Sequence, residues 1–310
     1  MSTIIHQSPG KAVHFRYRFS GGCPVMLIFL FPVRHSICIP RQSGIYYVEE
    51  RVTTLFQTGA FQTMHQLKTV AVIPARLAST RFPEKVIAEL GGKPIIQWVW
   101  ERTSKSKAGQ VLIATDSEKV LKIAESFGAE AVMTSPNHPS GSDRIWEAAK
   151  GIDCDIIINV QGDEPFMKPE VIDALIDVMA GGDKPDMATV VVPSTREEIA
   201  SNPNLPKVVV GADGSALYFS RSEIPFLRTG GTDMPLYRHW GIYAYRRSAL
   251  ERFVSLPESP LEKCEKLEQL RALENGMKIK VVKTHFQSIG IDTPEDLERA
   301  EAYLREHNER

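Results

Sequence analysis

From Val70 onward, the chain alternates short, continuous apolar runs with segments of helical periodicity, and this alternation limits the possible fold more than any other feature. Runs that are apolar throughout are typical of parallel strands, because such strands are buried on both faces. The alternation therefore predicts an α/β fold with a mostly parallel central sheet and helices on both of its faces. The expected strands are residues 70–73, 111–114, 131–133, 155–160, 187–192, 238–245 and 279–282.

The alternation is interrupted at residues 207–220, where Asp213 and Gly214 separate two β-rich runs. Because Asp-Gly between such runs is a hairpin signal, we expect an inserted β-hairpin subdomain for substrate binding or dimerisation. One helix is expected over residues 261–275. The last helix should begin at Thr293, since Pro294 and Asp296 follow it at the first-turn and capping-box positions.

Residues 1–63 differ from the rest of the chain. They contain six lysines and arginines but only two acidic residues, and they lack clean periodicity. We interpret them as an extension outside the fold, either disordered or read from an upstream start codon. Their acid-poor composition also resembles that of an organelle transit peptide. Residues 64–310 are expected to form a single domain.

The overall charge and the cysteines argue against several functional classes. A formal net charge of −1 indicates no global field that would attract nucleic acid or a membrane surface. Cys23, Cys38, Cys154 and Cys264 form neither a CxxC pair nor a zinc-binding spacing. Scattered single thiols are typical of a reducing cytoplasm, where we expect the protein to act.

A cationic loop follows the first expected strand and carries Arg76, Arg81 and Lys85. Ligands of open α/β sheets bind beyond the carboxyl ends of the strands. Three positive charges at that place suit a polyanion, most simply a nucleoside triphosphate. The alternative is a solvated basic loop. The sequence contains neither GxxxxGK[ST] nor GxGxxG, so phosphate-loop kinase and dinucleotide fingerprints are absent.

Two aspartates are candidate metal ligands. Asp163 follows the apolar run 155–160, and Asp292 follows a strand-like run at residues 288–291. If both face the same sheet edge, their carboxylates and the nucleotide phosphates would form an oxygen-rich site that suits Mg²⁺. The alternative is that each aspartate is a turn or capping residue.

Four side chains later in the chain are candidates for binding an acidic sugar. Arg221 ends the expected hairpin and His239 lies at the start of the strand after it, and both suit an anionic ligand. Glu268 and Gln269 lie on the expected helix over residues 261–275. The alternatives are a structural histidine and solvated helix residues.

Residues from about 67 to about 304 resemble the 3-deoxy-manno-octulosonate cytidylyltransferase family, which makes CMP-Kdo from 3-deoxy-manno-octulosonate (Kdo). The order of the matching stretches along the chain makes this resemblance more specific than any single motif. These stretches are IPARLASTRFPEK (73–85), ATD (114–116), SGSDR (140–144), NVQGDEP (159–165), ALYFSR (216–221), RHWGIYAYR (238–246), SPLEKCEKLEQLR (259–271) and IDTPEDLERA (291–300).

The resemblance implies a nucleotide-diphospho-sugar transferase-like domain, a homodimer and a Mg²⁺-dependent reaction in the cytoplasm. CTP and Kdo would give CMP-Kdo and pyrophosphate for lipopolysaccharide synthesis. Cytidylyltransferases for sialic acid or 8-amino-Kdo stay open as alternatives, as does a non-catalytic nucleotide-sugar binding module. The presence of Lys85, Asp163 and Asp292 together favours catalysis over binding alone.

The resemblance also implies roles for individual residues. Arg76, Arg81 and Lys85 would grip the triphosphate and form the catalytic set together with Asp163 and Asp292, the expected Mg²⁺ ligands. The nucleotide site would further include Ala75, Ala114, Thr115, Asp116, Ser142 and Arg144. The sugar site would comprise Gln161, Arg221, His239, Tyr243, Glu268 and Gln269.

Three features depart from the family pattern. Asp143 stands where the family has glutamate, Trp240 stands where a smaller apolar residue is usual, and the segment 225–237 is short. The short segment would lie near the sugar and the dimer edge, so these departures bear on sugar preference.

Overall fold

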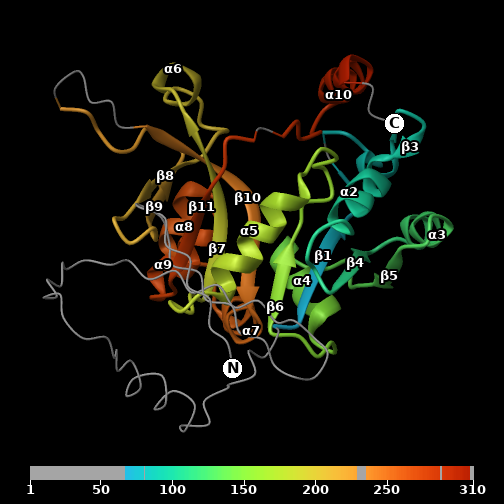
Figure 1. Ribbon diagram of the computed structural model, residues 1–310, viewed down its shortest axis with the longest axis horizontal. Coiled ribbons are helices and arrows are strands. Elements are labelled where there is room, and N and C mark those ends of the chain that lie inside the picture. Colours follow the sequence, from blue (N-terminus) through green and yellow to red (C-terminus); the bar gives the residue numbers. More distant parts are fainter. Residues whose placement is uncertain (1–66, 80, 229–234, 287, 308–310) are drawn as a thin grey trace, which may run out of the picture. The chain divides into compact units, whose positions relative to one another are not determined.

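The computed structural model of the protein describes residues 67–79, 81–228, 235–286 and 288–307 (Figure 1). The expected extension, residues 1–63, lies outside these described residues. The strands are β1 (Thr69–Ala75), β2 (Glu89–Leu90), β3 (Lys93–Pro94), β4 (Gln110–Thr115), β5 (Glu130–Met133), β6 (Ile156–Asn159), β7 (Met187–Ser194), β8 (Lys207–Val210), β9 (Ala216–Ser220), β10 (Leu236–Arg246) and β11 (Ile279–Lys283). The helices are η1 (Lys85–Ile87), α2 (Ile95–Thr103), α3 (Glu118–Ser126), α4 (Gly141–Ala149), α5 (Pro169–Ala180), α6 (Arg196–Ile199), α7 (Arg247–Ser255), α8 (Pro260–Glu265), α9 (Gln269–Glu274) and α10 (Pro294–His307).

The central sheet has the strand order β11-β7-β10-β6-β1-β4-β5. Strands β6, β1, β4 and β5 run parallel to one another, as do β7 and β11. Strand β10 runs antiparallel between β6 and β7, which aligns these two parallel groups in one direction. The expected mostly parallel α/β sheet is therefore confirmed.

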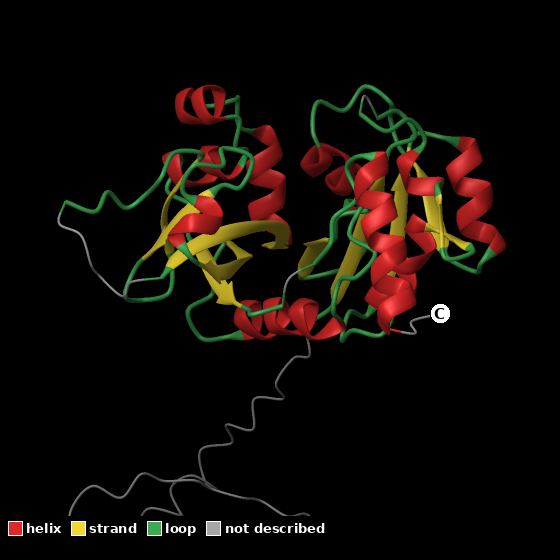
Figure 2. Ribbon diagram, turned by 90° about the horizontal axis from the view of Figure 1, so that it is seen from above, coloured by secondary structure: helices red, strands yellow, loops and turns green. Residues whose placement is uncertain are grey.

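Helices cover both faces of this sheet (Figures 1 and 2). The apolar residues of α2, α3 and α5 pack on one face, and those of α4, α7 and α9 pack on the other. The central strands are buried on both sides, which explains their continuous apolar sequences. None of the helices in the described part of the chain has the length and hydropathy that crossing a bilayer would require.

The expected hairpin is present. Strands β8 and β9 pair in antiparallel fashion on either side of the turn that contains Asp213 and Gly214, and β8 also pairs with β10. Gly214 has a φ of 76°, a left-handed conformation that glycine adopts without a steric penalty.

The prediction of one helix over residues 261–275 is wrong. The chain forms α8 and α9, separated at Lys266, whose φ of 51° is left-handed. The Arg221 guanidinium donates to the carbonyls of Glu265 (2.6 Å) and Lys266 (3.2 Å), so these acceptors point to a side chain instead of continuing a helical ladder. The bond from Arg221 to Lys266 joins residues 45 positions apart, and helical periodicity cannot reveal a contact between such distant residues.

The expected start of the last helix is confirmed. The Asp296 amide donates to Thr293 Oγ1 (3.3 Å), and the Thr293 amide donates to Asp296 Oδ2 (3.0 Å). Pro294 is the first residue of α10. Ala300 and Leu304 of this helix pack in a separate apolar cluster with Ile291, so the capped helix anchors the chain directly after Asp292.

Candidate functional site

The candidate site lies where three neighbouring parallel strands end. Strand β1 ends at Ala75, β4 ends at Thr115 and β6 ends at Asn159, and β1 lies between the other two. The loops that follow these strands therefore meet at one edge of the sheet, the position at which α/β proteins bind ligands.

Lys85 brings the two expected metal ligands together. Its Nζ lies 2.7 Å from Asp163 Oδ2 and 2.9 Å from Asp292 Oδ1, although Lys85 and Asp292 are 207 residues apart in sequence. Arg81 Nη2 approaches the same Asp292 oxygen at 3.1 Å. The sequence prediction that Asp163 and Asp292 face one edge is thus met by the geometry.

The charge of Lys85 is held in place by these carboxylates. Its side chain is 11% exposed, and this burial alone would lower the pKa of the ammonium. The ion pairs and hydrogen bonds with Asp163 and Asp292 outweigh burial and raise the pKa of Lys85 above its usual value. The site therefore keeps a fixed positive charge between two carboxylates.

The backbone around Asp163 and Asp292 sets their separation. The Ile291 amide donates to the Asp163 carbonyl at 2.9 Å, and the Asp292 amide donates to Asp296 Oδ2 at 2.9 Å. A Cβ at Gly162 would lie 2.7 Å from the Pro74 carbonyl, so only glycine permits this approach of the β6 loop to β1.

One sequence expectation about this region is wrong. Residues 288–291 do not form a strand, and Asp292 does not follow a sheet edge in the way that Asp163 does. Among the described residues, one backbone hydrogen bond joins this segment to the β6 loop, from Ile291 to Asp163, and one bond is too little to form a ladder. Asp292 reaches the site because α10 and this contact hold the segment beside the loop.

Glu164 also lies at the site, although no role for it was predicted from the sequence. Its side chain is half-buried with Oε2 shielded from solvent, and Trp240 Nε1 donates to its Oε1 at 3.0 Å. Burial, the largest influence, raises the pKa of Glu164 to about 7, while the hydrogen bond from Trp240 acts in the opposite direction. Its position directly after Asp163, in QGDEP, was the available signal.

The predicted nucleotide residues gather at the end of β4. Asp116 Oδ2 lies 2.8 Å from Arg144 Nη2, and Arg144 Nη1 donates to Thr134 Oγ1 at 2.6 Å. The Arg144 side chain is fully buried, and its bond to Asp116 stabilises the turn after Ala114 and Thr115 from the protein interior.

An open cleft of about 930 Å³ lies between the loops after β1 and β4. Arg76 lies directly before Leu77, the first lining residue, and its Nη2 donates to the His138 carbonyl at 2.9 Å. The lining residues are Leu77, Ala78, Ser79, Pro83, Glu84, Asp116, Ser117, Glu118, Lys119 and Pro136. The cleft has room for a nucleotide, and the loops after β1 and β4 that line it carry predicted nucleotide residues.

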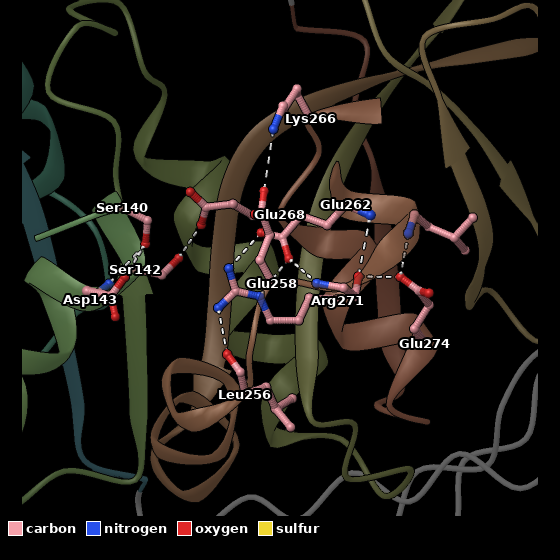
Figure 3. A network of polar contacts seen from close by, with 12 residues as sticks. Ser140, Ser142, Asp143, Leu256, Glu258, Glu262, Lys266, Glu268, Arg271 and Glu274 are labelled. Atoms are coloured by element: carbon pink, nitrogen blue, oxygen red, sulfur yellow. Dashed lines mark hydrogen bonds and ion pairs between the residues drawn. The ribbon is translucent and has the colours of Figure 1, made fainter. Parts of the chain in front are cut away.

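Three of the predicted sugar residues cluster with one predicted nucleotide residue. Ser142 Oγ donates to Glu268 Oε2 at 2.9 Å, and the Tyr243 hydroxyl donates to Gln269 Oε1 at 3.2 Å. Burial raises the pKa of Glu268, although the bond from Ser142 opposes this change. Figure 3 shows that the Ser142–Glu268 bond links α4 to the α8–α9 pair.

A salt bridge fixes the helices that carry Glu268 and Gln269. Arg271 Nε and Nη2 donate to the two carboxylate oxygens of Glu262 at 2.7 and 2.6 Å (Figure 3). Glu262 also closes a capping box with Ser259 at the start of α8. Because this bidentate pair is buried, it locks the angle between α8 and α9 and thereby the position of Glu268.

The other predicted sugar residues make protein contacts in this structure. Gln161 Nε2 donates to the Gly241 carbonyl at 2.6 Å. Arg221 Nη1 donates to the Pro203 carbonyl at 2.9 Å, in addition to its two bonds at the α8–α9 junction. Arg221 therefore positions the helices that carry Glu268 and Gln269.

His239 is buried in the sheet. Its Nε2 lies 3.0 Å from Thr189 Oγ1, and the Phe219 and Tyr243 rings lie 5.0 and 5.5 Å from its own ring centre. Thr189 Oγ1 donates to the Ile242 carbonyl at 2.8 Å, so it accepts from His239 Nε2. Burial lowers the pKa of His239 from 6.5 to about 3, and the imidazole is therefore neutral near pH 7.

This depressed pKa predicts a pH dependence of stability. Below pH 6.5 the unfolded chain binds a proton at His239 that the folded protein binds only near pH 3, so the stability contributed by neutral His239 is lost as pH falls. His239→Gln should flatten the decline of the unfolding free energy between pH 6 and 4 by up to about 1.4 kcal/mol per pH unit. Denaturant unfolding of both proteins across this range measures the difference. Equal slopes would show that His239 titrates normally in the folded protein.

Comparisons with known proteins agree on one family. A family profile described as cytidylyltransferase matches residues 70–279. The chain is 50% identical over 241 residues to the 3-deoxy-manno-octulosonate cytidylyltransferase of Chloroherpeton thalassium, with 77% of this chain and 98% of the relative covered. It is 47% identical over 239 residues to the enzyme of the same name from Synechococcus elongatus, with 76% and 98% covered.

A solved structure agrees with the sequence relatives. The fold matches that of a CMP:2-keto-3-deoxy-manno-octonic acid synthetase complexed with CTP, with a TM-score of 0.75 and 39% identity. The match covers 77% of this chain and 99% of that protein. The fold and the family resemblance inferred from the sequence are thus confirmed together.

Proposed function

Because the chain belongs to the 3-deoxy-manno-octulosonate cytidylyltransferase family, we propose that it transfers CMP from CTP to Kdo and releases pyrophosphate. The observation that carries this proposal, beside the family, is the convergence of Lys85, Asp163 and Asp292 at the carboxyl edge of the sheet. A fixed cation and two acids beside a nucleotide-sized cleft are what a phosphoryl-group transfer between two anionic substrates requires.

In the proposed reaction, the anomeric hydroxyl oxygen of Kdo bonds to the α-phosphorus of CTP and loses its proton. The bond from that phosphorus to the pyrophosphate oxygen breaks. Such a transfer depends mainly on positioning and on stabilising charge. Arg76, Arg81 and Lys85 would bind the phosphates and stabilise the negative charge that grows on the leaving pyrophosphate.

The residues at the site fit a bound Mg²⁺. Asp163 and Asp292 already direct one carboxylate oxygen each at a single cationic centre, the Lys85 ammonium. Mg²⁺ usually takes one or two protein carboxylates and completes its octahedron with phosphates and water. Held there by Asp163 and Asp292, the ion would supply positive charge that favours deprotonation of the sugar hydroxyl. No cluster of three or more candidate ligands occurs among residues 67–307 as described.

The sugar would bind beside Ser142, Tyr243, Glu268 and Gln269. The bond between Ser142 and Glu268 joins the expected nucleotide and sugar sites, which favours a substrate arrangement in which the two ligands meet at α4. Gln161 lies two residues before Asp163 and would contact the sugar near the reacting atoms.

We further propose a cytoplasmic homodimer. Among the described residues, Cys154 and Cys264 are free thiols, which suits a reducing compartment. Leu217 on β9 and Phe226 in the following loop are 60% and 84% exposed, and apolar side chains of this kind are consistent with a protein interface near the hairpin.

A coupled pyrophosphate-release assay tests the proposed function. CTP should be required in preference to ATP, GTP and UTP, and Kdo should support faster turnover than sialic acid. Comparing Kdo with 8-amino-Kdo decides between the two closest sugar alternatives. Binding of CTP without any pyrophosphate release, with every sugar tested, would instead favour the binding module.

Replacing Arg221 should affect the sugar and spare the nucleotide. Arg221→Ala removes two bonds to the backbone between α8 and α9, next to Glu268 and Gln269, and one bond to the Pro203 carbonyl. We expect the KM for Kdo to rise about tenfold or more, the value of one charge-assisted hydrogen bond of roughly 1.5 kcal/mol, with the KM for CTP nearly unchanged.

Arg247→Ala is the matched control for this variant. The Arg247 guanidinium also donates to backbone carbonyls, those of Ala149, Lys150 and Ile152. It lies at the opposite edge of the sheet, where the end of β10 pairs with the start of β6. The control should lose stability without a change in either KM. An equal rise in the KM for CTP in Arg221→Ala would assign Arg221 to the nucleotide.

A further inference from the structure

Glu164 occupies the contact between the two chain segments that carry Asp163 and Asp292. It follows Asp163 in the loop after β6, and its carboxyl group faces the segment 288–291 that leads to Asp292. A Cβ built on Gly290 would lie 3.1 Å from Glu164 Oε1 and 3.5 Å from its carboxyl carbon. The segment 288–291 therefore passes close over the Glu164 carboxyl group, and an alanine at position 290 would require this group to move by a few tenths of an ångström.

The Glu164 carboxyl group also contacts the sheet. Trp240 Nε1 of β10 donates to Glu164 Oε1 at 3.0 Å, and the Trp240 ring packs 5.8 Å from that of Phe286, just before the segment. The side chain of Glu164 is thus held by the sheet on one side and supports the segment on the other. Glu164 Oε2 is shielded from solvent and has no hydrogen-bond partner among the described residues, an arrangement that costs folding free energy, so the group's presence beside the site needs a reason other than stability.

The same two segments are joined beside the reacting centre. The Ile291 amide donates to the Asp163 carbonyl, and Lys85 holds both carboxylates. The segment has no strand or helix of its own between residues 288 and 291, so its position depends on a few contacts. One of them is the contact between the Glu164 carboxyl group and the Gly290 backbone.

We propose that Glu164 is a positioning residue that fixes the distance between Asp163 and Asp292 by supporting the Gly290 backbone and accepting from Trp240. It acts through shape and this hydrogen bond and does not itself touch substrate or metal. The inference rests on the proposed function, because it takes Asp163 and Asp292 as the ligands of one Mg²⁺.

Two readouts test this role. The first is the Mg²⁺ concentration that gives half-maximal turnover, and the second is Mn²⁺ binding to the enzyme with CTP and without sugar, followed by electron paramagnetic resonance. In Glu164→Ala we expect both to weaken about tenfold, while turnover at saturating Mg²⁺ falls much less. Glu164→Gln keeps the size and the acceptor oxygen, so it should stay within about twofold of the wild type. Trp240→Phe removes the donor and should weaken both readouts by an intermediate amount.

A double-mutant cycle isolates the contact with Gly290. Gly290→Ala places a methyl group against the Glu164 carboxyl group and should weaken Mg²⁺ dependence about threefold. In a Glu164→Ala background the methyl group meets no carboxyl group, so the same change should have no further effect. Independent changes at the two positions would multiply their effects.

The outcomes separate this inference from the proposed function. If the wild-type protein showed no Mg²⁺-dependent transfer from CTP, the proposed function itself would be wrong. A wild-type protein with normal Mg²⁺ dependence, together with unchanged Mg²⁺ and Mn²⁺ responses in Glu164→Ala, would overturn only the positioning role. Equal losses in Glu164→Gln and Glu164→Ala would also overturn it, since the charge and not the shape would then matter. If Glu164→Ala does not fold, Trp240→Phe and Gly290→Ala still decide.

Discussion

Replacing Asp163 or Asp292 with asparagine is expected to lower turnover by at least about a hundredfold while the protein stays folded. Each change keeps the shape of the side chain but removes one negative charge from the site that Lys85 now occupies. A hundredfold loss corresponds to roughly 2.7 kcal/mol of transition-state stabilisation. The two carboxylates are 31% and 47% exposed, so the effect on stability should be small.

The double variant makes this expectation specific. If both carboxylates act through one ion, Asp163→Asn combined with Asp292→Asn should lose much less than the product of the single losses. Steady-state turnover against Mg²⁺ concentration measures all three proteins, and CTP binding should persist through Arg76, Arg81 and Lys85. Asp177→Asn is the control, because Asp177 makes an exposed ion pair with Lys107. Near-normal turnover in either single variant, or fully multiplicative losses, would mean that the aspartates do not share a catalytic metal.

The sheet could be predicted from the sequence because each strand is marked by a run of neighbouring apolar residues. Runs such as 70–73 and 155–160 are apolar throughout, and the structure buries β1 and β6 between two helical layers. The cap at Thr293 was also predictable, since its partner Asp296 is three residues away. Local patterns also placed Lys85 in the loop after the first strand, Asp163 after a buried strand and Asp292 just before a capped helix.

Features that depend on distant contacts could not be predicted. Periodicity gave one helix over residues 261–275, whereas Arg221 divides it at Lys266 from 45 residues away. The contacts of Glu164 carried no local signal, because they are with Trp240, 76 residues later, and with the backbone at Gly290. The apolar character of residues 288–291 suggested a strand, but the partners of this segment are a loop and a helix.

The site residues carried over by resemblance fall into two groups in the structure. Lys85, Asp163 and Asp292 meet directly, as do Ser142 and Glu268, while their roles towards substrates stay predictions. Arg221 and His239 instead make bonds within the protein. Arg221 and His239 could therefore affect sugar binding by positioning other residues of the pocket as well as by direct contact.

Replacing Lys85 with methionine should have the largest combined effect on activity and stability. Methionine keeps an unbranched apolar stem but leaves the carboxylates of Asp163 and Asp292 facing each other without the ammonium between them. Like charges so placed repel. Without Mg²⁺ we expect a loss of about 1–3 kcal/mol, the value of hydrogen bonds to a charged group, and a Tm lower by several degrees.

Mg²⁺ should separate the two roles of Lys85. If the ion binds between Asp163 and Asp292, it supplies the missing positive charge, so the Tm of Lys85→Met should recover towards that of the wild type as Mg²⁺ is added. Turnover should stay at least about a hundredfold low at saturating Mg²⁺, because the fixed charge that stabilises the leaving pyrophosphate is still absent. Lys107→Met, which breaks an exposed pair with Asp177, is the control and should change neither property. A Tm that is equally low with and without Mg²⁺ would show that the two carboxylates do not bind the ion, whereas restored turnover would limit Lys85 to holding them apart.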